Sequence, residues 1–349
     1  MSEENLKNKF WGTENPPFII AEMSGNHNQS LEKALAIVDA AASTGASAIK
    51  LQTFTEDSMT IESEEEHFQI TDPKSLWAGQ SLYNLYKTAK TPFEWHQPII
   101  ERAKSHGLIC FSSPFDEAAV DFLETLDVPA YKIASFECVD LPLISKAAST
   151  GKPLIISTGM ANLAEISDAV EAARSAGCRD LVLLKCTSTY PASAENTNLR
   201  TISKLRELFN CEVGLSDHTM GVGASVAAIA FGASVIEKHF TLDRNEGGVD
   251  AAFSLEPAEF KSLVQESNTA WKALGEVKFG PTVAEEKART RRRSIYITED
   301  MEKGDIFTTS NLRRIRPGHG LPPKYYTQLL GKRVSKSVKK GTPMQWHLI

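Results

Sequence analysis

The stretch FIIAEMSGNHNQSLEKALAIVDAAASTGASAIKLQT, residues 18–53, contains a complete strand–helix–strand unit. Its two ends, 18–23 and 47–53, are short apolar runs of the kind that form buried parallel strands. The segment between them has apolar residues at helical spacing, a residue suited to cap its start and a glycine suited to end it. These residues are Leu31, Leu35 and Val38, then Ser30, then Gly45. The unit predicts two parallel strands joined by a helix that covers one face of a sheet.

Similar apolar runs recur as far as residue 240, mostly separated by segments with helical spacing. The predicted strands are 18–23, 47–53, 108–113, 130–135, 153–158, 181–186, 213–217 and 235–240. Eight such units fit a closed (β/α)8 barrel, a fold of roughly 250 residues. An open doubly wound sheet would require a glycine-rich phosphate loop after an early strand, and the first turn, SGNHNQ, has none. We therefore predict an α/β fold with a (β/α)8 TIM barrel.

Length and composition bound the class of protein. The chain has 349 residues, which is more than one barrel needs and predicts a second, smaller domain. Its net charge of −6 gives no electrostatic reason to expect nucleic acid or a membrane as partner. The lack of a long apolar run and the polar N-terminal segment MSEENLKNKFW predict a cytoplasmic protein. None of the five cysteines forms a CxxC pair, so we expect reduced, buried thiols.

The C-terminal part of the chain has a different character. A basic stretch, KARTRRR, precedes short alternating segments with glycine turns. The pattern [IV]xxx[MV]xKG occurs twice there, ending at Gly304 and Gly341, so we expect one small unit used twice. We predict a barrel domain over 1–283, a linker over 284–293 and a small β-rich domain over 294–349. A domain of this size is expected to pack against another surface.

Residues 53–95 form a long insertion after the second predicted strand. It contains the acidic run EDSMTIESEEEHF, which we expect to be a solvated surface, and the aromatic stretch LWAGQSLYNLY. Long loops at the carboxyl ends of barrel strands often carry function. The insertion is therefore predicted to shape the mouth of a substrate site.

Polar residues are concentrated where the predicted strands end. The active site of a (β/α)8 barrel lies at this end, and a polar group in a dry barrel is costly unless it is paired. The residues are Glu22, Lys50, Gln52, Ser112, Ser113, Lys132, Ser135, Ser157, Thr158, Lys185, Thr187, Ser188, Ser216, Asp217, His218, Lys238 and His239. A whole ring of such residues indicates a site rather than isolated structural groups.

Two lysines of this ring, Lys50 and Lys132, together with the hydroxyl groups suit a phosphate or a carboxylate. The alternative is that each lysine pairs with a carboxylate such as Glu22 or Glu237. Glu22 itself could act as a general base, orient a nucleophile or neutralise Lys50. Residue spacing does not decide among these roles.

The two histidines of the ring, His218 and His239, end neighbouring strands, which lie about 4.8 Å apart, so both imidazoles can reach one divalent metal ion. Two protein ligands would leave positions open for water and substrate, as a catalytic ion requires. The alternative is a pair of hydrogen-bonded histidines, one of them a general acid. Asp217 either orients the His218 ring or caps the turn.

A series of motifs then occurs in an order that resembles the sialic acid synthase family: IIAEMSGNHNQS, KLQT, FSSPFD, AYKIAS, STGM, KCTSTYP, GLSDHT and EKHFTL. The segment RPGHGLPPKY at 316–325 and the doubled KG turns resemble the C-terminal antifreeze-like (SAF) domain of that family. The resemblance covers residues 17–349. It implies an enzyme that condenses phosphoenolpyruvate with an amino sugar to give a nine-carbon ulosonic acid.

The resemblance also implies roles for individual residues. The residues implied to bind phosphoenolpyruvate are Lys50, Ser113, Lys132, Ser135, Ser157, Ser188 and Ser216. Glu22, His218 and His239 are implied to be catalytic, the two histidines as ligands of a divalent metal, Mn²⁺ or Mg²⁺. Positions near the sugar are Gln52, Tyr190 and Asp250. Ser113 and Ser188 stand where relatives carry Thr and Asn, so the hydrogen-bonding group changes at the second of these positions.

Further implications concern assembly and the sugar. Arg316 is implied to be delivered by the SAF domain into the barrel of a partner subunit, which predicts a domain-swapped homodimer. Within the family, AEMSGNHNQS and LWAGQSLYNLYKTAKTPFEWH look most like the pseudaminic acid synthase branch. That branch implies 2,4-diacetamido-2,4,6-trideoxy-L-altrose as the sugar. The alternative is an N-acetylneuraminate or legionaminic acid synthase that uses an N-acetylmannosamine-type sugar.

Two other classes of protein stay open at this point. A Schiff-base aldolase is conceivable because Lys50, Lys132, Lys185 and Lys238 all lie near strand ends. A non-catalytic sugar- or ice-binding protein is suggested by the SAF-like segment. The polar ring inside the barrel argues against this last class.

Overall fold

The computed structural model describes residues 11–73 and 75–349, so all but the last residue of the N-terminal segment MSEENLKNKFW lies outside the described residues. Two compact units divide the chain between Gly275 and Glu276. Separate clusters of buried apolar side chains fill the two units. Each unit therefore has a hydrophobic core of its own.

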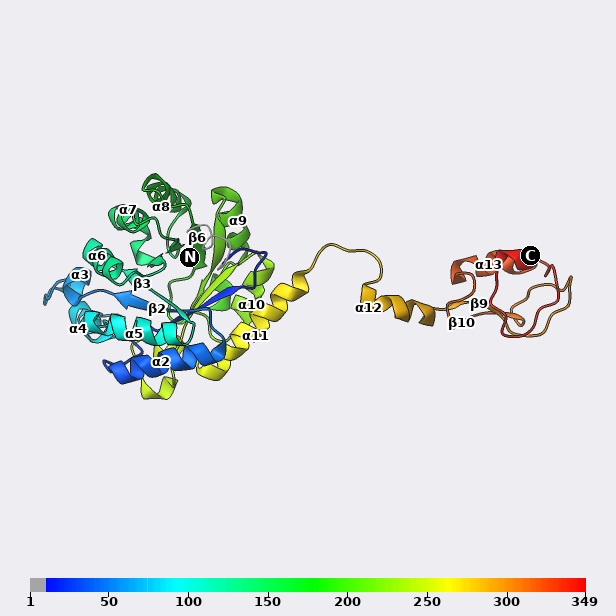
Figure 1. The fold of residues 1–349 in the computed structure, drawn as a ribbon, viewed down its shortest axis with the longest axis horizontal. Coiled ribbons are helices and arrows are strands. Elements are labelled where there is room, and N and C mark those ends of the chain that lie inside the picture. The colour runs from blue at the N-terminus through cyan, green and yellow to red at the C-terminus, as the bar shows by residue number, and fades with distance from the viewer. Residues whose placement is uncertain (1–10, 74) are drawn as a thin grey trace. The chain divides into compact units, whose positions relative to one another are not determined.

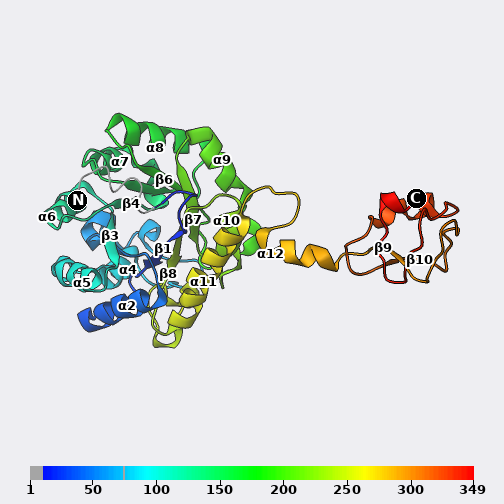
Figure 2. The same ribbon diagram turned by 45° about the vertical axis from the view of Figure 1, so that its right-hand side comes forward.

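The first unit is a closed barrel of parallel strands, which confirms the predicted fold (Figures 1 and 2). In the described part of the chain its strands are β1 (Phe18–Glu22), β2 (Ala48–Thr53), β3 (Ile109–Pro114), β4 (Tyr131–Ile133), β5 (Leu154–Ser157), β6 (Leu181–Cys186), β7 (Glu212–Asp217) and β8 (Val235–His239). They pair in chain order, and β8 returns to pair with β1. In the closing pair Glu22 lies beside His239, and on its other side it lies beside Lys50. Closure thus joins the first and last strand ends.

Helices surround the barrel (Figure 1). They are α2 (Leu31–Thr44), α3 (Glu56–Met59), α4 (Leu82–Ala89), α5 (Phe93–Ser105), α6 (Glu117–Thr125), α7 (Leu141–Ala148), α8 (Leu163–Ser175), α9 (Arg200–Phe209), α10 (Gly223–Ala230) and α11 (Pro257–Leu274). The start and end of α2 are as predicted: the Ser30 side chain accepts a hydrogen bond from the Lys33 N–H, and Gly45 ends the helix with φ of 84°. Within residues 11–73 and 75–349, no helix combines the length and apolar character needed to cross a membrane.

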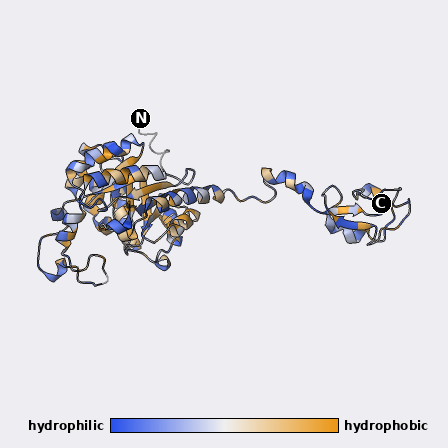
Figure 3. Cartoon of the chain, turned by 90° about the horizontal axis from the view of Figure 1, so that it is seen from below, coloured by the Kyte–Doolittle hydropathy of each residue, from blue (hydrophilic) through white to orange (hydrophobic). Residues whose placement is uncertain are grey.

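Alternation along the strands divides the apolar core of the barrel into two layers. Ile19 and Ala21 of β1 belong to the cluster that the surrounding helices cover, whereas Phe18 and Ile20 belong to a separate cluster inside the barrel. Figure 3 shows apolar residues gathered on the strands, inside helices of mixed character. The side chain of Glu22 points into the barrel, as those of Phe18 and Ile20 do. The interior of the barrel is therefore apolar toward the amino ends of the strands and polar at their carboxyl ends.

The second unit is small and β-rich, as predicted. It contains α12 (Val283–Glu286), β9 (Ser294–Ile297), β10 (Leu312–Ile315) and α13 (Tyr326–Leu329), and β9 pairs with β10 in antiparallel fashion. The two KG turns make equivalent hydrogen bonds, because Gly304 N–H donates to Val334 O and Gly341 N–H donates to Ile297 O, both at 2.8 Å. The predicted repeat is therefore present as a structural repeat.

Candidate active site

A cavity of about 600 Å³ opens at the carboxyl ends of the barrel strands. It is lined both by strand ends and by the predicted insertion. The predicted site residues in its lining are Glu22, Lys50, Gln52, Lys132, Ser135, Ser157, Tyr190, Ser216, His218, His239 and Asp250. The structure thus brings most of the predicted site residues into one cavity.

Two buried lysines and two buried glutamates meet at the base of this cavity. Lys50 Nζ lies 2.7 Å from Glu22 Oε2 and 3.7 Å from Glu237 Oε1. Lys132 Nζ lies 3.7 Å from the same oxygen of Glu237. Both lysines also donate to hydroxyl groups, Lys50 to Ser113 at 3.2 Å and Lys132 to Ser157 at 2.7 Å. The lysines therefore have the carboxylate partners that the sequence left as the alternative.

Burial and charge move the pKa values of these groups in different directions. Burial raises the pKa of Glu22 to about 7, although Lys50 acts against this shift. Burial also opposes the ionisation of Glu237, but the ammonium groups of Lys132 and Lys50 hold the pKa of Glu237 below its usual range. The pKa of Lys132 is lowered by burial. Glu237 is therefore ionised at neutral pH, whereas Glu22 exchanges its proton near neutral pH.

A chain of hydrogen bonds holds Glu22 from the opposite side to Lys50. Gln52 donates to Glu22 Oε1 at 2.9 Å and to the Ser24 hydroxyl at 3.1 Å. Ser24 in turn donates to Asp250 Oδ2. These hydrogen bonds link β1, β2 and the segment after β8, so they fix the Glu22 carboxyl at the cavity surface.

His218 and His239 lie side by side, with ring centroids 5.2 Å apart. His218 uses Nδ1 on the backbone carbonyl of Thr187 at 3.0 Å, an arrangement that fixes the ring and presents Nε2 to a ligand. His239 Nδ1 is buried and has no hydrogen-bond partner among the described residues; Asp250 Oδ2 lies 3.6 Å away. Burial first, and the nearby charge of His218 second, hold the pKa of His239 well below its usual range. A neutral, unpartnered imidazole beside a fixed one fits a divalent metal ion.

Few potential metal ligands lie together in the described part of the chain. In residues 11–73 and 75–349 no cluster of three or more His, Cys, Asp or Glu side chains is arranged to hold an ion. The two histidines fit an ion whose other positions are open to water and substrate, and they do not form a closed structural site.

Asp217 does not contact the imidazole of His218. Its Oδ1 accepts from the Thr219 N–H at 2.8 Å, and its Oδ2 accepts from Ser225 at 2.6 Å and from Lys238 at 2.7 Å. Asp217 thus caps the turn and neutralises a buried lysine. Lys238 and Lys185 do not line the cavity. Successive side chains of a strand point to opposite faces, and the next residues, His239 and Cys186, point into the barrel.

Three predicted site residues lie outside the cavity lining. Ser113 is buried behind Lys50, to which it is hydrogen-bonded, and Ser188 lies 3.7 Å from the Cys186 sulfur. Arg316 belongs to the second unit, where it follows β10 and is exposed. Its predicted contact with a partner subunit stays a prediction.

Sequence reasoning missed several residues of the site. Sequence patterns indicate Glu237 only as a partner for lysine and Cys186 only as a buried thiol, yet both line the cavity. Glu137 also lines it, from the short turn Phe136–Val139 after β4. Its Oε2 is buried with no hydrogen-bond partner in the described residues, and burial raises its pKa to about 7. Glu137 lies two residues after the predicted strand 130–135, so a search that extends two residues beyond each predicted strand includes it.

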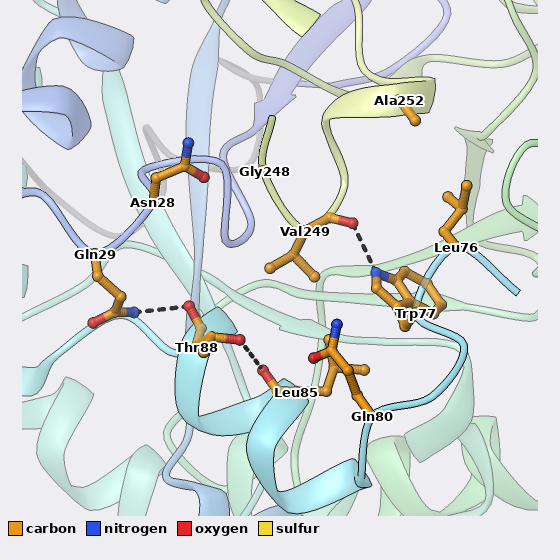
Figure 4. A pocket seen from close by; sticks show the side chains of 10 residues that line it. All are labelled: Asn28, Gln29, Leu76, Trp77, Gln80, Leu85, Thr88, Gly248, Val249 and Ala252. Atoms are coloured by element: carbon orange, nitrogen blue, oxygen red, sulfur yellow. Dashed lines mark hydrogen bonds between the residues drawn. The ribbon is translucent and has the colours of Figure 1, made fainter. Parts of the chain in front are cut away.

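The insertion lines the outer half of the cavity, as predicted. It contributes Phe54, Ser58, Met59, Ile70, Trp77, Leu82, Leu85, Tyr86 and Ala89. A second cavity of about 510 Å³, whose lining residues Figure 4 shows, shares Trp77, Leu85 and Val249 with the first. The indole N–H of Trp77 donates to Val249 O at 2.8 Å, which fixes the ring in the lining that the two cavities share (Figure 4 shows this hydrogen bond).

Comparisons with known proteins agree with this geometry. Residues 37–279 match the NeuB family and residues 292–349 match the SAF domain. The chain is 47% identical over 335 residues to a pseudaminic acid synthase of Campylobacter jejuni, covering 96% of this chain and 97% of the relative. It is 44% identical over 331 residues to that of Helicobacter pylori, covering 94% and 96%. The crystal structure of the N-acetylneuraminic acid synthetase from Leptospira borgpetersenii, in complex with citrate, superposes with a TM-score of 0.71 at 33% identity, covering 79% of this chain and 91% of that one.

These lysines, histidines and glutamates lie at the carboxyl ends of the barrel strands, and a SAF domain follows the barrel. Together these features define an enzyme of the sialic acid synthase type. The chain belongs to the NeuB family.

Proposed function

We propose that this enzyme is a pseudaminic acid synthase. It condenses phosphoenolpyruvate with 2,4-diacetamido-2,4,6-trideoxy-L-altrose and water to give the nine-carbon ulosonic acid and inorganic phosphate. The observation that carries the reaction class is the buried pair Lys50 and Lys132, which converges on one oxygen of Glu237 at the base of the cavity. The similarity to two pseudaminic acid synthases supports the choice of sugar.

The lysines are suited to bind the phosphate and carboxylate of phosphoenolpyruvate. Each stands 3.7 Å from Glu237 Oε1, which is too long for a good hydrogen bond, so part of the donor capacity of each ammonium group is available to an incoming anion. The hydroxyl groups of Ser157 and Ser216 lie in the same lining and add neutral donors. An anion here exchanges weak contacts with Glu237 for direct charge-assisted hydrogen bonds.

His218 and His239 would hold the divalent metal ion, Mn²⁺ or Mg²⁺. When bound, such an ion supplies Lewis acidity toward the aldehyde oxygen of the open-chain sugar. The protein contribution is the fixed ring of His218 and the unpartnered nitrogen of His239.

The proposed chemistry begins with attack of C3 of phosphoenolpyruvate on the aldehyde carbon. Positive character then develops at C2, water adds there, and phosphate leaves with cleavage of its C–O bond. Glu22 is suited to stabilise the cationic centre and to take the proton of the water, because its pKa of about 7 allows it to accept and release a proton near neutral pH. Gln52 keeps one oxygen of this carboxyl oriented throughout.

The test is phosphate release from phosphoenolpyruvate with a panel of sugars, with and without EDTA. We expect release with 2,4-diacetamido-2,4,6-trideoxy-L-altrose, loss of release in EDTA and recovery on adding Mn²⁺. Turnover only with N-acetylmannosamine-type sugars would favour the neuraminate or legionaminate alternative. Activity that EDTA does not change, with a borohydride-trapped adduct, would replace the metal role by a Schiff base.

A further inference from the structure

We infer that Glu237 acts as a fixed counter-charge that limits how tightly the site holds anions, and so allows inorganic phosphate to leave after the reaction. The inference rests on the proposed function and deepens it, because it assigns a role in product release to a residue that takes no part in the proposed chemistry. The observation behind it is that Lys50 and Lys132 converge on one oxygen of this buried carboxylate.

Glu237 lies on the floor of the cavity. In strand register it pairs with Ser216 of β7 and Ile20 of β1, whereas His239 pairs with Glu22, two residues further along β1. Ile20 belongs to the apolar cluster inside the barrel. The Glu237 carboxyl group therefore stands at the boundary between the polar end of the interior and its apolar layer.

Two buried ammonium groups need a negative charge nearby before substrate binds. The exposed fractions of Lys50 and Lys132 are 3% and 1%, and burial of such charges without a partner is strongly unfavourable. Glu237 Oε1 lies 3.7 Å from both Nζ atoms and accepts a hydrogen bond from Ser216 at 3.3 Å. Glu237 therefore favours the ionised form of both lysines before an anionic substrate arrives.

The same negative charge opposes the binding of anions. The distance of 3.7 Å is too long for a good hydrogen bond, so each lysine can turn N–H groups to an anion while Glu237 stays in the floor. Glu237 Oε2 is buried and has no hydrogen-bond partner among the described residues. A phosphate held by the lysines therefore lies close to a carboxylate charge that repels it.

This repulsion has different consequences for the substrate and for the product phosphate. Phosphoenolpyruvate carries a carboxylate and a phosphate on one molecule, so it can bind both lysines at once and gains affinity from the linkage. After the C–O bond breaks, inorganic phosphate and the ulosonic acid carboxylate are separate anions without that gain. The charge of Glu237 therefore keeps a single phosphate weakly bound, in a step that often limits the turnover of enzymes.

The experiment measures the binding of inorganic phosphate and of phosphoenolpyruvate by calorimetric titration in EDTA, so that no metal ion contributes. Glu22 lies 2.7 Å from Lys50 and can take up the charge that Glu237 loses, so binding is measured in variants that all carry Glu22→Gln. Glu237→Gln then keeps an oxygen for the lysines and removes the charge. Glu212→Gln is the matched control, because Glu212 is ion-paired with Arg206 at the first residue of β7 and does not line the cavity.

We expect Glu237→Gln to tighten the binding of inorganic phosphate at least about tenfold, and Glu212→Gln to leave it unchanged. In the enzyme that retains Glu22, Glu237→Gln should make added phosphate a stronger inhibitor of turnover. Glu237→Asp keeps the charge but withdraws it by one methylene group, so it should tighten phosphate binding by a smaller factor. This second variant decides the question if Glu237→Gln folds poorly.

Unchanged or weaker phosphate binding in the folded Glu237 variants would overturn the inference, because a residue that only positions the lysines loses anion binding when it is altered. The proposed function would stand after that result, provided that phosphoenolpyruvate binds to the protein with Glu237 unaltered. Absence of phosphoenolpyruvate binding to both Glu22→Gln and the unaltered enzyme would overturn the proposed function and the inference with it.

Discussion

Glu22 occupies the position where the barrel closes. It lies beside Lys50 on β2 and beside His239 on β8 in strand register, and its side chain is buried. Its carboxyl contacts Lys50 on one oxygen and Gln52 on the other. A carboxyl in this setting is oriented before substrate arrives, which favours a direct role in the reaction over simple neutralisation of Lys50.

Glu22→Gln should separate binding from chemistry. The amide keeps the shape and the hydrogen bond to a donor but cannot accept a proton from water. We expect kcat to fall by at least about a hundredfold, while phosphoenolpyruvate still binds because Lys50 and Lys132 remain. Single-turnover kinetics and calorimetric titration with phosphoenolpyruvate check the two parts. Loss of phosphoenolpyruvate binding in folded protein would assign Glu22 to the anion site instead.

The same variant should change how stability depends on pH. The pKa of Glu22 is raised from 4.5 to about 7 in the folded protein, so protonation of Glu22 stabilises the fold. That stabilisation is complete below about pH 4.5 and is lost as pH rises through about 7. We expect the free energy of unfolding of the unaltered protein to fall relative to Glu22→Gln over this range, by on the order of 3 kcal/mol. Denaturant unfolding at several pH values measures it; a constant difference would contradict the raised pKa.

At the scale of elements, the loop after β5 brings two predicted phosphoenolpyruvate-binding residues together. The Gly159 N–H donates to the Ser135 hydroxyl at 3.2 Å. A Cβ placed on Gly159 would lie 2.2 Å from Ser188 Oγ and 2.7 Å from Ser135 Oγ. The glycine is therefore needed for the close approach of three successive strand ends, those of β4, β5 and β6.

Gly159→Ala should damage the site more than the fold. The added methyl must displace the hydroxyl groups of Ser135 and Ser188, so we expect the KM for phosphoenolpyruvate to rise about tenfold or more. Thermal unfolding should change little, since Ser135 borders the cavity and Ser188 is only half-buried. Gly214→Ala is a useful contrast, because its methyl would lie 2.1 Å from the Val235 carbonyl of β8 and should destabilise the barrel itself. An unchanged KM in Gly159→Ala would contradict the importance of this loop.

The elements of the barrel could be predicted because each is a local pattern. The apolar run 181–186 is β6 to the residue, and Ser30 and Gly45 bound α2 as expected. Residues whose importance depends on long-range geometry could not be predicted. Glu237 acquires its position between Lys50 and Lys132 only when the barrel closes, and the apolar residues of α4 give no sign in sequence that they face a cavity rather than the core.

At the scale of the whole molecule, the chain consists of two units with separate cores. Arg316 in the second unit is exposed, and its side chain makes no hydrogen bond or ion pair with any residue from 11–73 or 75–349. A guanidinium left without a partner is available for an anionic or carbonyl group of a ligand. If the predicted domain swap occurs, this arginine would act in the barrel of a second subunit.

Mixing two inactive variants tests that swap. We expect Arg316→Ala to lose about a hundredfold in kcat/KM for the sugar and to keep phosphoenolpyruvate binding, with Arg313→Ala as the neighbouring control. In a swapped dimer of Arg316→Ala with Glu22→Gln, one barrel has Glu22 and receives Arg316 from its partner, so it is complete. Co-expression should therefore restore about a quarter of the unaltered activity, because about half of randomly paired dimers are mixed and each has one complete site. If size-exclusion chromatography shows that the co-expressed variants are dimeric but their activity is not restored, each barrel uses its own Arg316, or none.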